Sequence, residues 1–292
     1  MARRRRGRLS RLVALLLVAG AVAAAFVYGP TLLDRYGDRL FSNSRCTVNV
    51  DGVASTLTAE QSNNAALIAA AAIRKGLPAH AVTVAIAAAF QESDLRNIDY
   101  GDRDSLGLFQ QRPSQGWGTA DQILDPYYAA GQFYDHLVLI DGWEDMSVTD
   151  AAQAVQRSGH PLGYADHEAD ARAWARVLTG EVSPRSLSCS LPGGPPDALA
   201  ETAFASRLDG DFGSAASATV EPRDDGSRAV RVTASSEQAA RAAAAWSIAV
   251  ASRWSVVDVT TCDGRWSREN GAWEDAADTS ACDAVIVVVR SP

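Results

Sequence analysis

Long apolar runs dominate the first half of the chain. Residues 65–74 are nearly all Ala, Ile and Leu, and residues 79–90 are again almost wholly apolar. Gly76 and Pro78 separate the two runs, which is typical of one helix ending and another beginning. Thr58-Ala59-Glu60-Gln61 has the spacing of a capping box at the start of the first helix. A helix that is apolar all round is buried on all sides, so the pattern predicts two core helices.

Short β-branched segments and turn signals dominate the last third. Asn270-Gly271 is a strong hairpin signal, and the Asp-Asp-Gly stretch at 224–226 is another. The predicted elements are a short helix at 197–208, a hairpin of 218–221 with 229–233, an Ala-rich helix over 235–252, a strand over 254–261, a hairpin of 264–268 with 272–273, and a last strand over 284–289. Trp266 and Trp273 can face each other across the second hairpin. We favour packing for this pair, with a ligand-facing pair as the alternative.

A third apolar run, residues 12–28, follows six Arg within residues 3–11. Its seventeen residues lie at the short end of a membrane span, which is about 17–25 residues, and exceed the usual apolar core of a signal peptide, about 7–15 residues. We therefore expect a single-pass transmembrane helix in the cell membrane, with the body extracytoplasmic. Ala21-Val22-Ala23 leaves cleavage and secretion as the alternative.

These patterns predict five segments. They are a basic N-terminus and transmembrane helix over 1–30, a juxtamembrane tether over 31–55, a helical domain over 56–189, a Pro/Gly linker over 190–196, and an α+β accessory domain over 197–292.

Charge and histidine spacing exclude several classes of function. The net charge is −8 although the first 30 residues hold six Arg and no acid, so the remaining chain is more acidic still. Nucleic-acid binding needs clustered basic residues and is not expected. The four histidines show no zinc-binding spacing, so we predict no metal and no cofactor.

Four cysteines are present without a CxxC motif. Three disulfide pairings are possible if the chain is exported. We favour Cys46–Cys189 with Cys262–Cys282, because each bond then lies within one predicted domain. Four buried free thiols are the alternative.

Glu92 lies at or near the end of the second buried helix. Desolvation and the partial negative charge of a helix C-terminus both raise the pKa of a carboxyl group. A carboxyl that stays protonated near neutral pH is suited to general acid catalysis. The alternative is a Glu that caps its helix or pairs with Arg96.

The polar loop that follows, residues 94–118, carries candidate ligand-binding side chains. Gln110 and Gln111 offer donors and acceptors suited to sugar hydroxyl and acetamido groups, and Tyr100 and Trp117 offer flat faces for sugar rings. Residues 106–109 are interpreted as a short strand or extended segment. An irregular loop held by Asp–Arg pairs is the alternative.

Two motifs carry a family resemblance. Glu92-Ser93 after an apolar helix, followed by Gly107-Leu108-Phe109-Gln110, resembles the soluble lytic transglycosylase and goose-type lysozyme group of the lysozyme-like superfamily. That group has Glu-Ser, a loop, and then Gly-Leu-Met-Gln. The helix predicted over 127–137 after Asp125-Pro126 agrees, and helices at 148–158 and 167–179 complete the region. The family's Ala-Tyr-Asn-Ala-Gly motif, whose tyrosine helps to place the substrate, is replaced here by residues 155–159, and Tyr164 is the candidate for the missing ring.

The resemblance implies a fold class, namely a mainly α lysozyme-like catalytic domain plus a small C-terminal α+β domain and an N-terminal transmembrane helix. It also implies that Glu92 protonates the bond between N-acetylmuramic acid and N-acetylglucosamine in peptidoglycan. The same Glu then removes the proton of the muramyl 6-hydroxyl, which gives a 1,6-anhydro product. The implied substrate-binding residues are Ser93, Tyr100, Gln110, Gln111, Trp117 and Tyr164.

Two alternatives remain open. A muramidase would need a second carboxylate, for which Asp99, Asp102 and Asp104 are candidates. A non-catalytic scaffold would use the same fold to hold glycan or a partner in a wall-synthesis, secretion or conjugation complex. The expected partners are therefore glycan strands, the membrane through the N-terminal helix, and proteins of such a complex.

Overall fold

The computed structural model describes residues 44–191, 201–223, 226–275, 282 and 284–289, and residues 44–292 form one compact unit. Two of the predicted segments lie largely outside these described residues. The basic N-terminus with its apolar run, residues 1–30, lies outside the described residues, and so do residues 192–196 of the predicted linker.

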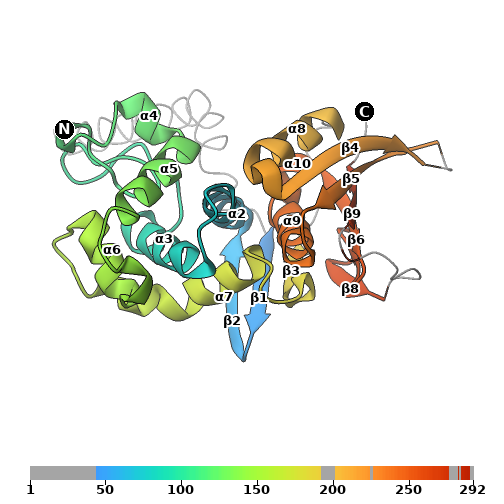
Figure 1. Cartoon of the computed structure of the whole chain (residues 1–292), viewed down its shortest axis with the longest axis horizontal. Helices are drawn as coiled ribbons and strands as arrows, with labels where there is room; N and C mark the ends of the chain where they lie inside the picture. The colour runs from blue at the N-terminus through green and yellow to red at the C-terminus, as the bar shows by residue number, and fades with distance from the viewer. Residues whose placement is uncertain (1–43, 192–200, 224–225, 276–281, 283, 290–292) are drawn as a thin grey trace, which may run out of the picture. The chain divides into compact units, whose positions relative to one another are not determined.

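The first part of the unit is mainly helical (Figure 1). Its strands and helices are β1 (Arg45–Val50), β2 (Val53–Thr58), α2 (Ala59–Arg74), α3 (Ala79–Ser93), α4 (Ala120–Leu124), α5 (Pro126–Leu137), α6 (Val148–Gln156), α7 (Glu168–Leu178) and β3 (Leu187–Ser190). Its 3-10 turns are η1 (Pro113–Gln115), η2 (Trp143–Asp145), η3 (Gly163–His167) and η4 (Pro184–Ser186).

The second part combines helices with a sheet. Its elements are α8 (Glu201–Phe212), η5 (Gly213–Ala215), β4 (Ala216–Pro222), β5 (Arg228–Ala234), α9 (Glu237–Ala249), α10 (Ala251–Trp254), β6 (Val256–Thr261), β7 (Gly264–Ser267), β8 (Ala272–Glu274) and β9 (Ala284–Val289).

The two predicted core helices are confirmed. Thr58 caps α2 in a capping box, because its hydroxyl accepts the N–H of Gln61 and the Gln61 side chain accepts the N–H of Thr58. Pro78 is the residue before α3. From Ala81 to Ala89 the side chains of α3 are buried. Small side chains let the two helices lie within the core of the first part, and α3 carries that packing to the residues just before Glu92.

A three-stranded antiparallel sheet, in the order β2-β1-β3, lies beside these helices. Cys46, Val48 and Val50 alternate on the buried side of β1, which is the period of a half-buried strand. Cys46 faces Cys189 directly in the β1–β3 pair, and the two are joined by a disulfide. The second predicted disulfide, Cys262–Cys282, is also confirmed. The pairing of all four cysteines is therefore as the sequence predicted.

The second sheet has six antiparallel strands in the order β4-β5-β9-β6-β7-β8. Figure 1 shows α8, α9 and α10 on one side of this sheet. Both predicted hairpins are present, β4 with β5 and β7 with β8. Trp266 and Trp273 are directly opposite each other; Trp266 is fully buried and Trp273 donates its indole N–H to the Leu187 carbonyl at 2.7 Å. The pair therefore serves packing.

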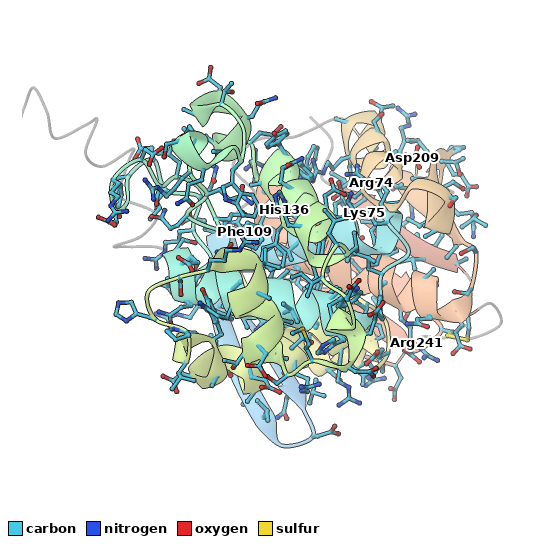
Figure 2. All side chains as sticks on the ribbon, turned by 60° about the vertical axis from the view of Figure 1, so that its left-hand side comes forward. Arg74, Lys75, Phe109, His136, Asp209 and Arg241 are labelled. Atoms are coloured by element: carbon cyan, nitrogen blue, oxygen red, sulfur yellow. A yellow bond between two sulfur atoms is a disulfide. The ribbon has the colours of Figure 1, made fainter. Side chains whose placement is uncertain are left out.

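Hydrogen bonds join the two parts of the unit. Ser62 of α2 donates its hydroxyl to the Ala249 carbonyl of α9 at 2.9 Å, and this bond is buried. Gln238 of α9 donates to the Thr179 carbonyl at 3.1 Å. Arg74, at the end of α2, donates to the Gly210 carbonyl of α8 at 3.1 Å, and Figure 2 shows Arg74 close to Asp209. These bonds explain why residues 44–292 form one unit.

The predicted fold class was wrong. Apart from the stretch 106–109, strands were expected only in a small C-terminal domain, yet β1, β2 and β3 form a sheet in the first part, and the second sheet has six strands. β1 and β2 form a local hairpin that the sequence analysis missed, whereas β3 pairs with β1 over a long sequence separation that a local pattern does not reveal. The extended stretch 106–109 was also interpreted wrongly. Leu106 and Gln111 form a single β-bridge, and a turn lies between them.

The predicted single-pass membrane location is corrected as well. Among the described residues, no helix combines the length and apolarity that a bilayer crossing requires. The segment that was predicted to cross, residues 12–28, lies outside the described residues. The two disulfides are typical of proteins that fold in an oxidising compartment.

Candidate active site

The last turn of α3 holds Glu92 in a fixed position. The helix ends at Ser93 and is followed by Asp94 and Leu95, which both have a left-handed backbone with φ of 56° and 55°. Their N–H groups donate to the carbonyls of Phe90 and Ala89. Two side-chain amides of α2 hold the same turn: Gln61 donates to the Asp94 carbonyl at 2.9 Å and Asn64 to the Leu95 carbonyl at 2.8 Å. The backbone around Glu92 is therefore fixed by its neighbours in the core.

The Glu92 carboxyl is half-buried and is bound by neutral donors. The Tyr164 hydroxyl donates to Glu92 Oε1 at 2.8 Å, and the Gln156 side chain lies near enough to lower the pKa of the carboxyl. Burial raises the pKa of Glu92 above its usual value. The bonds from Tyr164 and Gln156 and the nearby charge of His160 act in the opposite direction and are weaker. The Glu92 carboxyl therefore favours its protonated form. When it is ionised, the Tyr164 hydroxyl still donates a hydrogen bond to it.

Ser93 connects the Glu92 helix to the loop that follows. Its hydroxyl lies 2.7 Å from the Leu108 carbonyl and 3.1 Å from the Ala89 carbonyl. Both contacts are to backbone, so Ser93 positions the turn 107–110 next to Glu92. Gly107 has a φ of +76°, and a Cβ there would lie 2.7 Å from the Ile123 carbonyl. Only glycine fits this position without moving the backbone of α4.

The two adjacent glutamines have different environments. Gln110 is half-buried in a left-handed conformation, and its amide lies 3.3 Å from the carbonyls of Tyr100 and Gly107. Gln111 is buried, with 2% of its surface exposed, and donates to the Ala129 carbonyl of α5 at 3.0 Å. Gln110 therefore belongs to the loop beside Glu92, whereas Gln111 attaches that loop to α5.

The two predicted aromatic faces are also separated. Tyr100 is 61% exposed, and its carbonyl is in contact with the Gln110 side chain. Trp117 is half-buried and packs against His136 of α5, with 4.1 Å between ring centroids. Figure 2 shows His136 on the same side of the molecule as Phe109. Tyr100 keeps a free face for a ligand, whereas one contact of Trp117 is already made by His136.

The three candidate second carboxylates do not contact Glu92. Asp104 accepts hydrogen bonds from Arg112 Nε at 2.7 Å and from the Ser114 N–H at 2.8 Å. The bonds from Ser114 and Arg112 lower the pKa of Asp104 far below its usual value. Asp99 and Asp102 are exposed, and Asp102 lies 3.7 Å from Arg103. Among the described residues, the groups that shift the Glu92 pKa are Tyr164, Gln156 and His160, and none is an acid.

Gln156 is the residue that sequence analysis missed. Its Nε2 donates to the Phe109 carbonyl at 2.8 Å, and its side chain also acts to lower the pKa of Glu92. The available signal was the altered motif at residues 155–159, which was noted as a departure but not as a source of a site residue. Tyr164, proposed as the substitute ring, is fully buried and bound to Glu92. Burial and the neighbouring Glu92 raise the pKa of Tyr164, so it stays a hydroxyl donor.

The structure thus brings together Glu92, Ser93, Gln110 and Tyr164 of the predicted residues, and adds Gln156. Comparison with known proteins does not identify a family for this chain. No family model matches the chain, and no curated protein matches its sequence.

Proposed function

We propose that this protein cleaves peptidoglycan glycan strands between N-acetylmuramic acid and N-acetylglucosamine as a lytic transglycosylase. The observation that carries the proposal is the half-buried Glu92, with a raised pKa, bound by the Tyr164 hydroxyl at 2.8 Å. A carboxyl in this state can give a proton to a leaving oxygen at neutral pH.

In the first step, Glu92 donates its proton to the glycosidic oxygen and the bond from that oxygen to muramyl C1 breaks. The electron pair of this bond leaves with the oxygen, and the 2-acetamido group of the substrate supports the positive charge at C1. Glu92 is now a carboxylate, and the donors Tyr164 and Gln156 stabilise that form.

In the second step, the Glu92 carboxylate removes the proton of the muramyl 6-hydroxyl. The 6-oxygen bonds to C1 and closes a 1,6-anhydro ring, so no water is consumed and Glu92 regains its proton. One residue therefore acts first as acid and then as base.

The surroundings of Glu92 favour this reaction over hydrolysis. A muramidase needs a second carboxylate to activate water or attack C1. Asp104 is occupied by Arg112 and Ser114, and Asp99 and Asp102 lie in exposed positions of the loop. The transglycosylase mechanism does not require such a group.

The exposed apolar side chains also fit a glycan. Tyr100 is 61% exposed and Leu162 is 78% exposed. Tyr100 lies in the same loop as Gln110, whose amide contacts the Tyr100 carbonyl. Leu162 lies in the segment between Gln156 and Tyr164. Flat or apolar side chains on both segments offer contact surface for successive pyranose rings.

The test uses residues 44–292 with both disulfides formed, incubated with purified sacculi, and mass analysis of the released fragments. We expect 1,6-anhydro muropeptides from the wild type and their release at least about 100-fold more slowly from Glu92→Gln. Glu144→Gln, an exposed carboxyl on η2, is the matched control and should release the same products as wild type.

Each other outcome points to a different function. Fragments with reducing ends, which contain one more water, would replace the transglycosylase by a muramidase. Retention on sacculi without any product, in both wild type and Glu92→Gln, would replace it by a glycan-holding scaffold.

A further inference from the structure

Three consecutive residues at the end of α3 contact the turn η3. Phe90 stacks on His167, with 5.4 Å between the ring centroids and 10° between the ring planes. Gln91 Oε1 lies 3.2 Å from His167 Nε2. Glu92 Oε1 accepts the Tyr164 hydroxyl at 2.8 Å. Because consecutive side chains of an α-helix point about 100° apart, η3 must wrap around the last turn of α3 to meet all three.

Gln91 also lies directly against the backbone of η3. A Cβ placed on Gly163 would lie 2.8 Å from both Cδ and Oε1 of Gln91 and 3.0 Å from its Nε2. A side-chain carbon does not fit at such distances, so the Gln91 amide can lie here only because residue 163 is glycine. Tyr164 follows Gly163 directly in the sequence. The contact therefore fixes the stretch of backbone from which the Tyr164 side chain extends.

The two contacts of Gln91 with η3 lie on either side of Tyr164 in the sequence. Gly163 comes before it, and His167 comes after it. Gln91 Oε1 can only accept a hydrogen bond, so His167 Nε2 carries the hydrogen that they share. Gln91 thus holds η3 at both ends of the short stretch that carries the donor to Glu92.

We propose that Gln91 is a positioning residue of the site, which seats η3 so that the Tyr164 hydroxyl meets the Glu92 carboxyl. This inference rests on the proposed function of the same site. Gln91 takes no part in the proton transfers described above, and its effect is geometric. A hydrogen bond weakens steeply as the donor leaves its alignment, so a small shift of η3 would weaken the bond between Tyr164 and Glu92.

The first test replaces Gly163 by alanine. The three atoms nearest to the new methyl group all belong to the Gln91 amide, so Gly163→Ala displaces the contact without a clash against backbone. The bond from Tyr164 stabilises the carboxylate form of Glu92, so its weakening should raise the Glu92 pKa. If the contact only supported the fold, its loss would let water reach Glu92, and the pKa would fall toward its ordinary value.

The Glu92 titration is followed by carbon-13 NMR of the labelled full chain, with Glu92→Gln used to assign the signal. Gly159→Ala, in the same segment, is the matched control, because a Cβ at Gly159 meets nothing within 4 Å. We expect a higher Glu92 pKa in Gly163→Ala and an unchanged one in Gly159→Ala. An unchanged or lower pKa in a folded Gly163→Ala, or an equal rise in both variants, would overturn the inference.

Double variants show whether the effect passes through Gln91 and Tyr164. Gln91→Ala should itself raise the Glu92 pKa, because η3 loses its seat. It also makes room for the methyl group, so adding Gly163→Ala should then cause no further rise. Tyr164→Phe removes the hydroxyl, so Gly163→Ala should change nothing in that background either. A rise of the same size in all three backgrounds would contradict a positioning role of Gln91.

Kinetics add a second measurement. Gly163→Ala and Gln91→Ala should each lower kcat on sacculi by roughly threefold to tenfold, the effect of one weakened hydrogen bond. KM should stay close to that of wild type, and the alkaline limb of kcat/KM should move to higher pH. A loss that appears in KM alone would count against the inference.

The two proposals fail separately. If the wild type releases no glycan product, the proposed function fails, while the NMR titration still decides whether Gln91 positions Tyr164 against Glu92. If the wild type is active and the titration moves in the wrong direction, only the role of Gln91 fails.

Discussion

Among the described residues, two carboxyl groups have a pKa raised by burial, and their partners differ. Glu92, in the first part, accepts a hydrogen bond from Tyr164, and Tyr164 and Gln156, the side chains that lower its pKa by hydrogen bonding, are both neutral. Asp211, in α8, has its pKa raised to about 6 and lies 2.9 Å from the guanidinium of Arg207. Because the donors near Glu92 are neutral, Glu92 can release and regain its proton. The permanently charged Arg207, in contrast, holds Asp211 in an ion pair. A raised pKa therefore identifies a candidate acid only together with the charge of its partners.

The surroundings of Arg207 show what the second carboxyl does. Its guanidinium lies 3.8 Å from the ring centroid of Tyr127 on α5, and Asp211 itself is 4% exposed. The pair thus joins α8, in the second part of the unit, to α5 in the first. Asp211 holds elements together, while Glu92 faces a segment with exposed residues.

The largest effect is expected when each carboxyl is replaced by its amide. Glu92→Gln should lower the rate on sacculi by roughly 100-fold to 10,000-fold, the usual contribution of general acid–base catalysis. Its free energy of unfolding should be unchanged or higher, because a neutral amide replaces a desolvated acid.

Asp211→Asn should leave kcat within about twofold of wild type, since it removes no group from the Glu92 site. Rate assays and urea unfolding of the two variants test this contrast. A rate loss in Asp211→Asn as large as that in Glu92→Gln would remove the distinction between the two sites.

Removal of the cation is the next largest effect. Arg207→Met leaves Asp211 buried without its partner, so we expect a loss of about 3–5 kcal/mol in the free energy of unfolding at pH 7. Arg231→Met is the matched control, because Arg231 pairs with Glu221 at 2.8 Å on an exposed surface; it should cost about 0–1 kcal/mol. Equal losses in the two variants would show that burial does not govern the Arg207 pair.

The pH dependence of stability gives a third measurement. The pKa of Asp211 is about 6 in the folded chain, against 3.8 as its ordinary value. A raised pKa means that the folded state binds the proton more tightly, so this stabilisation is complete below pH 3.8 and is lost as the pH rises through 6.

Relative to Asp211→Asn, the wild type should therefore lose about 2 kcal/mol of unfolding free energy between pH 4 and pH 7. Urea unfolding of both chains at several pH values gives this difference. A wild-type advantage that grows with pH would mean that attraction to Arg207 outweighs desolvation.

The smallest effect is expected from the neutral donor of the first site. Tyr164→Phe removes the hydroxyl bond to Glu92 and should lower kcat by about tenfold while raising the pKa of Glu92, since a bond to a charged group contributes roughly 1.5–3 kcal/mol. Tyr127→Phe, at the Arg207 contact, keeps its ring and should change neither value. The pH profile of kcat/KM measures both, and a Glu92 pKa that falls in Tyr164→Phe would contradict the expectation.

Local signals in the sequence predicted much of the fold. The capping box of Thr58 and Gln61 and the turn at Asn270-Gly271 act over a few residues, and both form as predicted. The β1–β3 pair was missed because six α-helices separate the two strands in the sequence, and the local hairpin of β1 with β2 was missed although Asp51-Gly52 forms its turn. Cys46 and Cys189 were nevertheless paired correctly, since four cysteines allow few combinations.

The candidate site was predictable to the same extent. An apolar helix ending at Glu92 was visible in the sequence, and Tyr164 was identified as a substitute ring. The role of Gln156 was not, because its side chain depends on the left-handed turn at Arg157 and on a carbonyl 47 residues away. Gln111 was assigned to ligand binding from its chemistry, while the fold turns it toward α5.

The Cys46–Cys189 bond has a mechanical consequence. The first part of the unit begins at β1 and ends at β3, and the two strands are neighbours joined by this covalent bond. A pulling force applied between residue 45 and residue 190 therefore passes directly through the disulfide. The intervening helices, which hold Glu92, Gln156 and Tyr164, lie within the closed loop and carry no tension. In the oxidised chain, the candidate site should keep its geometry under a load that would unfold the reduced chain.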